Sequence, residues 1–394
     1  MILNKQHAAV LMVVLASSQM HAQSQNVIHA ILFVAVLHFF YVFLSTRQNK
    51  SFLLILLLPI AYILAIFFIQ PYKINIYHYL GYLTALFILA WVMLLEWDSK
   101  KIAYFLTAYG SYLILTGFLE KALTNAIRVG QAALTVATAY AVVLVVTWTI
   151  WIIIVFLSKM HSKKTILLGT FLVFLAIIFS GTRMGLLGIF FGLGLCTLSA
   201  VFIESKKFSI IKTVAYSLGI IIALSLLSVI VWNLLPNDLL IKKTFSSLIA
   251  GKLDASNMGR VLMWYYAINV FEQNMLLGIG AGNFPEKYKL FLQSMNVYEN
   301  VGINTHAHNI FLVVLSEHGI IGFLTLGTFV FLCLLQPFLY FLKNRQSPVF
   351  YALFSGFIVI AILGLVDAIP MHMPTTGFAA WFLGTCASFG TRRV

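Results

Sequence analysis

The sequence predicts an all-α polytopic membrane protein with about twelve transmembrane helices and one long loop on the outer face. Of its 394 residues, 61% are hydrophobic and only 9% are charged, and the mean hydropathy is +0.99. A soluble core could not bury this much apolar surface, because ordinary globular domains carry about 25% charged residues. Lipid must be the solvent for most of the chain, and helices satisfy their own backbone hydrogen bonds there.

Apolar runs long enough to cross a bilayer occupy both ends of the chain and leave one long polar stretch between them. We expect residues 1–235 to hold the first nine spans, residues 236–318 to form a loop with short helices, and residues 319–394 to hold the last three. The first run could instead be a cleaved signal peptide. If it is retained as a span, most of the Lys and Arg residues between the later spans fall on one side of the membrane. The predicted spans are 6–24, 26–45, 52–70, 76–96, 102–119, 131–157, 165–181, 183–203, 209–235, 319–342, 349–367 and 374–390.

The distribution of Lys and Arg predicts how these spans are oriented. With a cytoplasmic N-terminus, most cations fall on the cytoplasmic side, and the short outer loops hold only Lys73, Lys121, Arg128 and Arg183. The net charge of +14 would suggest nucleic acid as the partner of a soluble protein, but here the positive-inside rule explains it and no nucleic acid is expected. Both termini should therefore be cytoplasmic, and the long loop should face outward, which in a bacterium is the periplasm.

Two arginines on the outer face are candidate anion-binding residues. Arg183 follows a very tight hairpin in which Thr182 can cap the next helix, and Arg260 follows Ser256 and Asn257, either of which can cap a helix. Both arginines are thus expected in the first turn of a helix. A cation there opposes the macrodipole at a cost of about 0.3–1 kcal/mol, which indicates that an anion is bound nearby.

Phosphate fits this arrangement, because a helix N-terminus offers free N–H groups and an arginine adds a bidentate, permanently charged fork. The structural alternative is that Arg183 snorkels to lipid headgroups and Arg260 pairs with a loop acid such as Asp254.

A histidine-rich segment, 305–322, lies between the polar loop and the next apolar run. His308 is expected near a helix N-terminus, which disfavours the imidazolium and leaves a neutral base at pH 7. His306 and His318 compete for the same role, and a hydrogen-bonded loop histidine is the structural alternative. A metal site built from His306, His308 and Glu317 matches no zinc spacing, so no metal is expected.

Two further features of the loop admit more than one interpretation. The glycine-rich segment 278–283 is either a flexible bend before Pro285 or a phosphate cradle. Glu317 lies near an apolar run, where acids are often functional, and could orient His308 or an arginine. The aromatic residues Trp264, Tyr265, Tyr266 and Phe271 favour interfacial packing over a sugar platform.

These segments together resemble the O-antigen ligase and polymerase superfamily of bacterial envelope glycan enzymes, and most closely the lipopolysaccharide O-antigen ligases. His308-Asn309, nine residues and then Gly319-Ile320-Ile321-Gly322 fit the ligase pattern of His followed by Asn, Ser or Gln, nine residues, and Gly-x-x-Gly. The resemblance covers about 175–325. Its other motifs are the Ser/Thr-Arg turn at 180–185, the Gly-Arg pair at 259–260 with Trp264, and 277–284.

The resemblance implies a metal-independent, inverting glycosyltransferase of the GT-C class with no cofactor, located in the bacterial inner membrane. The donor would be a polysaccharide on undecaprenyl pyrophosphate and the acceptor a sugar hydroxyl of lipid A–core. Arg183 and Arg260 would bind the pyrophosphate, and His308 would be the general base. Asn309, Gly280 and Gly282 are also expected to contact substrate, and whether Glu317 and His306 support the base is open on the sequence alone.

Three other functions stay open on the sequence alone. The same superfamily includes polymerases that join lipid-linked repeat units and ligases that glycosylate protein serines. A polyprenyl-linked glycan transporter is the alternative from a different class, but a transporter should place charges along a path through its helices. Here the polar groups gather on one face, which favours chemistry at the membrane surface.

Overall fold

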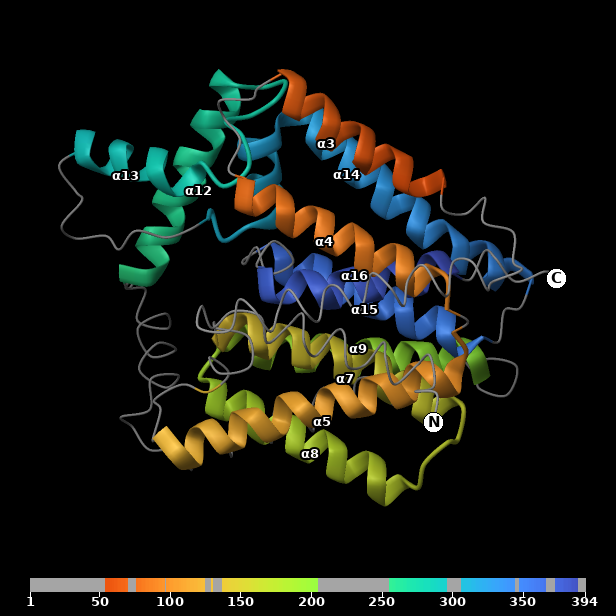
Figure 1. Cartoon of the computed structure of the whole chain (residues 1–394). Helices are drawn as coiled ribbons and strands as arrows, with labels where there is room; N and C mark the ends of the chain where they lie inside the picture. The colour runs from red at the N-terminus through yellow and green to blue at the C-terminus, as the bar shows by residue number, and fades with distance from the viewer. Residues whose placement is uncertain are drawn as a thin grey trace. The chain divides into compact units, whose positions relative to one another are not determined.

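The computed structural model describes residues 54–69, 76–95, 97–124, 129, 137–204, 255–295, 306–343, 347–365 and 373–388. This part of the chain contains helices and no strand, as the all-α prediction requires (Figure 1). The helices are α3 (Leu57–Ile69), α4 (Ile76–Met93), α5 (Ser99–Thr124), α7 (Ala137–Leu157), α8 (Lys163–Ser180), α9 (Arg183–Glu204), α12 (Ala255–Gln273), α13 (Phe284–Ser294), α14 (Ile310–Lys343), α15 (Pro348–Gly364) and α16 (Met373–Ser388).

Five of the described helices are long and apolar enough to cross a membrane, namely α5, α7, α8, α9 and α14. Each of them coincides with a predicted span. The helices α3, α4, α15 and α16 also lie within or close to predicted spans, although α3, α15 and α16 are shorter, with 13, 17 and 16 residues. The predicted spans 6–24, 26–45 and 209–235 lie outside the described residues, so the count of twelve stays a prediction. The chain is a multi-pass membrane protein.

The chain divides into two compact units that interleave along the sequence. Unit 1 comprises residues 1–37, 95–249 and 337–363, and unit 2 comprises residues 38–94, 250–336 and 364–394. These two units are defined by contacts between residues in space. The predicted boundaries at 235 and 318 instead separate membrane spans from the long loop, and they stay a prediction.

Unit 1 is built around α7, whose side chains are buried along almost its whole length. Small residues on the neighbouring helix α9 allow close packing, as is common between membrane helices. A Cβ atom at Gly188 would come within 2.8 Å of Val145, and one at Gly192 would collide with Thr149. The indole N–H of Trp151 donates to Thr107 on α5 at 2.9 Å, which adds a polar link between helices.

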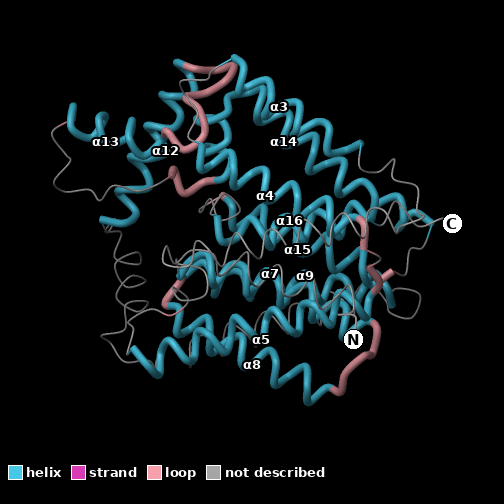
Figure 2. The backbone as a smooth tube through the Cα atoms, in the orientation of Figure 1, coloured by secondary structure: helices cyan, strands magenta, loops and turns pink. Residues whose placement is uncertain are grey.

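Unit 2 contains α3, α4, α16, the pair α12 and α13, and most of α14. The helix α14 is broken at Gly319, whose φ of 62° and ψ of −167° are not helical. Residues 310–318 thus form a short helical segment before the long one, and the predicted span 319–342 begins at this break. The loop between α12 and α13 folds back against the break (Figure 2).

Candidate functional site

The Arg183 hairpin in unit 1 is as tight as the sequence predicts. Helix α8 ends at Ser180, Gly181 adopts a left-handed conformation with φ 64°, and α9 begins at Arg183. The Ser180 hydroxyl donates to the Ile177 carbonyl at 2.7 Å, so the Thr182 hydroxyl, 2.9 Å away, donates to Ser180. Thr182 therefore closes the turn through Ser180, and Arg183 occupies the first turn of α9, as predicted.

Arg260 lies one turn further into its helix than the sequence suggested. Helix α12 begins at Ala255, so Ser256 and Asn257 are inside the helix and Arg260 is its sixth residue. The prediction of a first-turn position is wrong here, because Ala255-Ser256-Asn257 continue the helix instead of capping it. The macrodipole argument for an anion falls off beyond the first turn and thus does not apply to Arg260. Arg260 is half-buried, and an arginine side chain offers a planar fork of donors that suits a phosphate.

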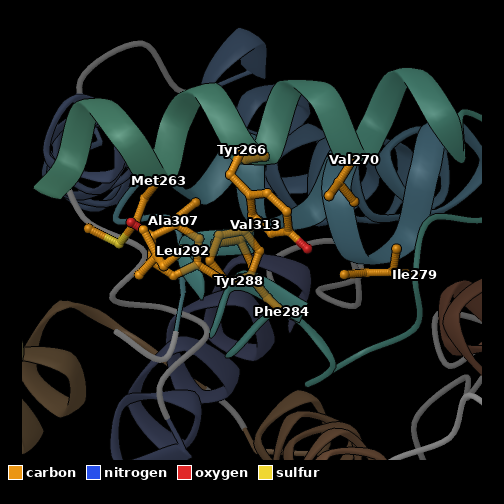
Figure 3. Packing of buried hydrophobic residues seen from close by; sticks show 10 residues of the cluster. Met263, Tyr266, Val270, Ile279, Phe284, Tyr288, Leu292, Ala307 and Val313 are labelled. Carbon is orange, nitrogen blue, oxygen red and sulfur yellow. The ribbon is translucent and has the colours of Figure 1, made fainter. Parts of the chain in front are cut away.

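The helix that carries Arg260 shares one hydrophobic core with the residue next to His308. Met263, Tyr266 and Val270 of α12 pack against α13 and against Ala307, which is fully buried (Figure 3). Met263 lies three residues after Arg260, and therefore on a neighbouring part of the helix surface. The structure thus brings the Arg260 helix and the His308 segment together in unit 2. Arg183 belongs to unit 1, and its convergence with these two residues stays a prediction.

Of the four aromatic residues predicted to pack on α12, Tyr266 belongs to this core, whereas Tyr265 is 57% exposed; their position at the membrane interface stays a prediction. The ring centroid of Tyr266 lies 5.3 Å from those of both Phe284 and Tyr288. Burial raises the pKa of Tyr266 and of Tyr288 to about 12. Both hydroxyl groups are therefore protonated at pH 7, and neither competes with His308 as a base.

His308 has an unusual backbone conformation just before a helix. Its φ of 46° lies in the left-handed region, where residues other than glycine are uncommon. Its N–H donates to Nδ1 of His306 at 3.3 Å, and the two imidazole rings meet edge to face with centroids 4.5 Å apart. His306 is 8% exposed, whereas His308 is partly open to solvent. The predicted position of His308 near a helix N-terminus is confirmed.

Asn309 is the N-cap of α14. Its side-chain oxygen accepts hydrogen bonds from the N–H groups of Phe311 at 2.9 Å and Leu312 at 3.1 Å. Its amide nitrogen donates to the Leu365 carbonyl at 2.8 Å. Both ends of the side chain thus have structural partners, so Asn309 acts on the site by fixing the start of the helix that follows His308. The prediction that Asn309 contacts substrate has no test here.

The glycine-rich loop after α12 pairs its backbone with the broken part of α14. The N–H groups of Ile279 and Gly280 donate to the carbonyls of Ser316 and Glu317 at 3.0 and 2.9 Å, and the N–H of Ile320 donates to the Met275 carbonyl at 2.8 Å. The break in the helix frees these groups, and the loop satisfies them. The N–H of Gly280 is thus engaged within the protein, which disfavours a phosphate cradle at this residue. That Gly280 and Gly282 contact substrate stays a prediction.

Glu317 holds the loop from the other side. Its carboxyl oxygen Oε1 accepts from the N–H of Phe284, the first residue of α13, at 3.3 Å, and the N–H of Gly282 also faces the group. Glu317 is 6% exposed. Glu317 therefore anchors the start of α13 to α14, and its support of His308 stays a prediction.

His318 is held by two tyrosines that sequence reasoning missed. The Tyr62 hydroxyl lies 3.1 Å from Nδ1 and the Tyr82 hydroxyl lies 3.3 Å from Nε2. Both ring nitrogens of His318 thus have partners, and the residue joins α3 and α4 to the break in α14. These contacts favour a structural role for His318 and leave the choice of His308 as base a prediction. No sequence signal marks these tyrosines, which lie more than two hundred residues away on apolar helices.

Among the residues that the structure describes, no three His, Cys, Asp or Glu side chains are grouped as metal ligands. The alternative metal site of His306, His308 and Glu317 therefore receives no support: Nδ1 of His306 accepts a backbone N–H and Glu317 is turned to the α13 backbone.

A comparison with protein families agrees with this geometry. The family model described as O-antigen ligase matches residues 168–327. No curated protein matches the chain. The matched region begins in α8 and ends in α14, so it includes Arg183, Arg260, His308 and the break at Gly319. Residues 168–327 therefore carry a domain that is similar to the O-antigen ligase family, which supports the predicted resemblance to the O-antigen ligase and polymerase superfamily.

Proposed function

We propose that this protein transfers O-antigen polysaccharide from undecaprenyl pyrophosphate to a sugar hydroxyl of lipid A–core at the periplasmic face of the inner membrane. The observation that carries the proposal is the fixed conformation of His308 beside the Arg260 helix, inside the region that matches the O-antigen ligase family. Enzymes of this family are glycosyltransferase-like ligases and polymerases that act on lipid-linked glycans. The choice of ligase and of this acceptor is the specific part of the proposal.

The reaction is a single displacement at the anomeric carbon of the donor. His308 accepts the proton of the acceptor hydroxyl, the oxygen forms the new glycosidic bond, and the bond between the anomeric carbon and the pyrophosphate oxygen breaks. One displacement inverts the configuration. The electron pair of the broken bond goes to undecaprenyl pyrophosphate, which leaves with increased negative charge.

Arg183 and Arg260 are proposed to stabilise that charge. A guanidinium keeps its charge at every physiological pH and binds phosphate oxygens through two parallel hydrogen bonds. Stabilisation is catalytic when it is stronger for the leaving group in the transition state than for the bound donor. Because the energy of transfer is stored in the lipid-linked donor, the reaction as proposed uses no nucleotide and no metal ion.

The structural features of His308 suit a general base. It is partly open to solvent, so an acceptor hydroxyl can reach it. Both of its neighbours are fixed, Ala307 by burial in the hydrophobic core and Asn309 by its hydrogen bond to the Leu365 carbonyl. The match to the O-antigen ligase family favours an enzyme over a transporter, and the polymerase of the same superfamily is the remaining alternative.

The proposal is tested by deleting the gene and analysing lipopolysaccharide and lipid-linked glycan on gels. A ligase is expected to leave lipid A–core without any cap, while the lipid-linked polymer accumulates. Complementation with the wild-type gene should restore the cap, and complementation with His308→Ala should not, although the variant protein inserts at the wild-type level on an immunoblot. A cap of single repeat units in the deletion strain would identify a polymerase instead. Normal capping by His308→Ala would contradict the general-base role.

A further inference from the structure

His306 accepts a hydrogen bond from the backbone of the proposed base, His308. A backbone N–H can only donate, so the 3.3 Å hydrogen bond from the His308 N–H requires that Nδ1 of His306 is an unprotonated acceptor. Neutral His306 must therefore carry its proton on Nε2. The ring is 8% exposed, so this acceptor lies in a largely water-free position and is available to His308.

The conformation of His308 needs such support. A residue other than glycine in a sparsely populated backbone region is strained, and this conformation persists only where its surroundings fix it. Here Nδ1 of His306 holds the N–H, and Ala307, at 0% exposed, anchors the preceding residue in the core. Asn309 anchors the following residue through the Leu365 carbonyl.

The ring contact adds a second constraint. The imidazole planes of His306 and His308 meet at 82° with centroids 4.5 Å apart. Aromatic rings favour this edge-to-face arrangement, so His306 limits the orientation of the His308 ring as well as its backbone. One side chain thus acts on both parts of the same residue.

We propose that His306 is a positioning residue for His308: its Nδ1 holds the His308 backbone in the left-handed conformation, and its ring sets the plane of the His308 imidazole. The inference rests on the proposed function, in which His308 is the general base. A base must be held within about 0.5 Å of its productive position, and a displacement of about 1 Å can cost a hundredfold in rate.

The test measures transfer by the purified full-length protein in detergent, with an undecaprenyl-pyrophosphate-linked glycan as donor and lipid A–core as acceptor. His306→Ala removes the acceptor atom and should lower kcat by about 10- to 100-fold. The KM for the donor should change by less than about twofold, since His306 does not bind it. His306→Asn places an oxygen close to the position of Nδ1 and should restore most of kcat, whereas His306→Gln places its amide one carbon further out and should not.

A double-mutant cycle separates this inference from the proposed function. In a His308→Ala background, His306→Ala should cause no further loss, because a positioning residue acts only through the residue that it positions. Wild-type activity of His308→Ala would refute the general-base role of His308 on which this inference rests, whatever His306 does. A kcat of His306→Ala close to wild type, or equal rates for His306→Asn and His306→Gln, would overturn the positioning role. The Asn and Gln variants decide the matter even where His306→Ala does not accumulate.

Discussion

At the scale of single residues, the proposed reaction depends on charge that is fixed in place before the substrate arrives. Arg183 starts a helix, as its sequence context predicts, whereas Arg260 lies in the second turn of α12. The predicted first-turn position is confirmed for Arg183 and wrong for Arg260, because a Ser or Asn near the start of a helix is also compatible with its interior. Arg260 is therefore a candidate anion-binding residue because of its place in the order of the motifs, and not because of the helix macrodipole.

We therefore predict that the shape of the arginine side chain matters as much as its charge. Arg260→Ala and Arg183→Ala should each cut transfer by about 10- to 1,000-fold, as the loss of a preorganised charge stabiliser does. Replacement by Lys should recover little, since a point charge cannot form the bidentate pair. Initial rates at several donor concentrations measure this effect.

Lys287→Ala, which removes an exposed cation of α13, is the matched control and should behave like wild type. Unchanged donor binding and turnover in the arginine variants would contradict the pyrophosphate assignment.

At the scale of elements, the first part of α14 is positioned by its break and not by helix propensity. Gly319 combines φ 62° with ψ −167°, a conformation almost restricted to glycine. A Cβ atom there would collide with the Leu276 backbone, and one at Gly322 would collide with the Tyr62 hydroxyl. The Gly-x-x-Gly motif thus has a physical explanation. The sequence predicted the helices and the motif, but not the loop that pairs with the break or the tyrosines around His318, because those contacts join segments far apart in the chain.

Gly319→Ala should accordingly destabilise the protein strongly. Backbone strain alone costs about 1–3 kcal/mol, and the collision with Leu276 adds to it. The thermal unfolding temperature of the protein in detergent should fall well below that of wild type. Gly327→Ala is the matched control in the same helix, because a Cβ atom there meets nothing within 4 Å and alanine favours a helix. Equal unfolding temperatures for the two variants would show that the break does not need glycine.

At the scale of the whole molecule, the composition alone predicts the all-α membrane class, since apolar helices are its direct consequence. The division into two interleaved units was not predictable in the same way. A hydropathy profile locates apolar segments one after another along the chain, whereas each unit is assembled from segments that are distant in sequence. Residues 337–343 at the end of α14 belong to a different unit from its beginning, so a single helix crosses the division.

The orientation of the whole chain remains a prediction from its positive charges, and the active site can function as proposed only if that orientation is correct. Exposed lysines on the two predicted sides allow a direct test: Lys287 lies on α13 in the loop expected in the periplasm, and Lys163 begins α8 on the expected cytoplasmic side. Each is replaced by Cys in a background without the three native cysteines. A membrane-impermeant maleimide, added to cells with a permeabilised outer membrane, should label Lys287→Cys at once and Lys163→Cys only after lysis. The reverse pattern would place His308 in the cytoplasm, away from any periplasmic acceptor, and would exclude the proposed reaction.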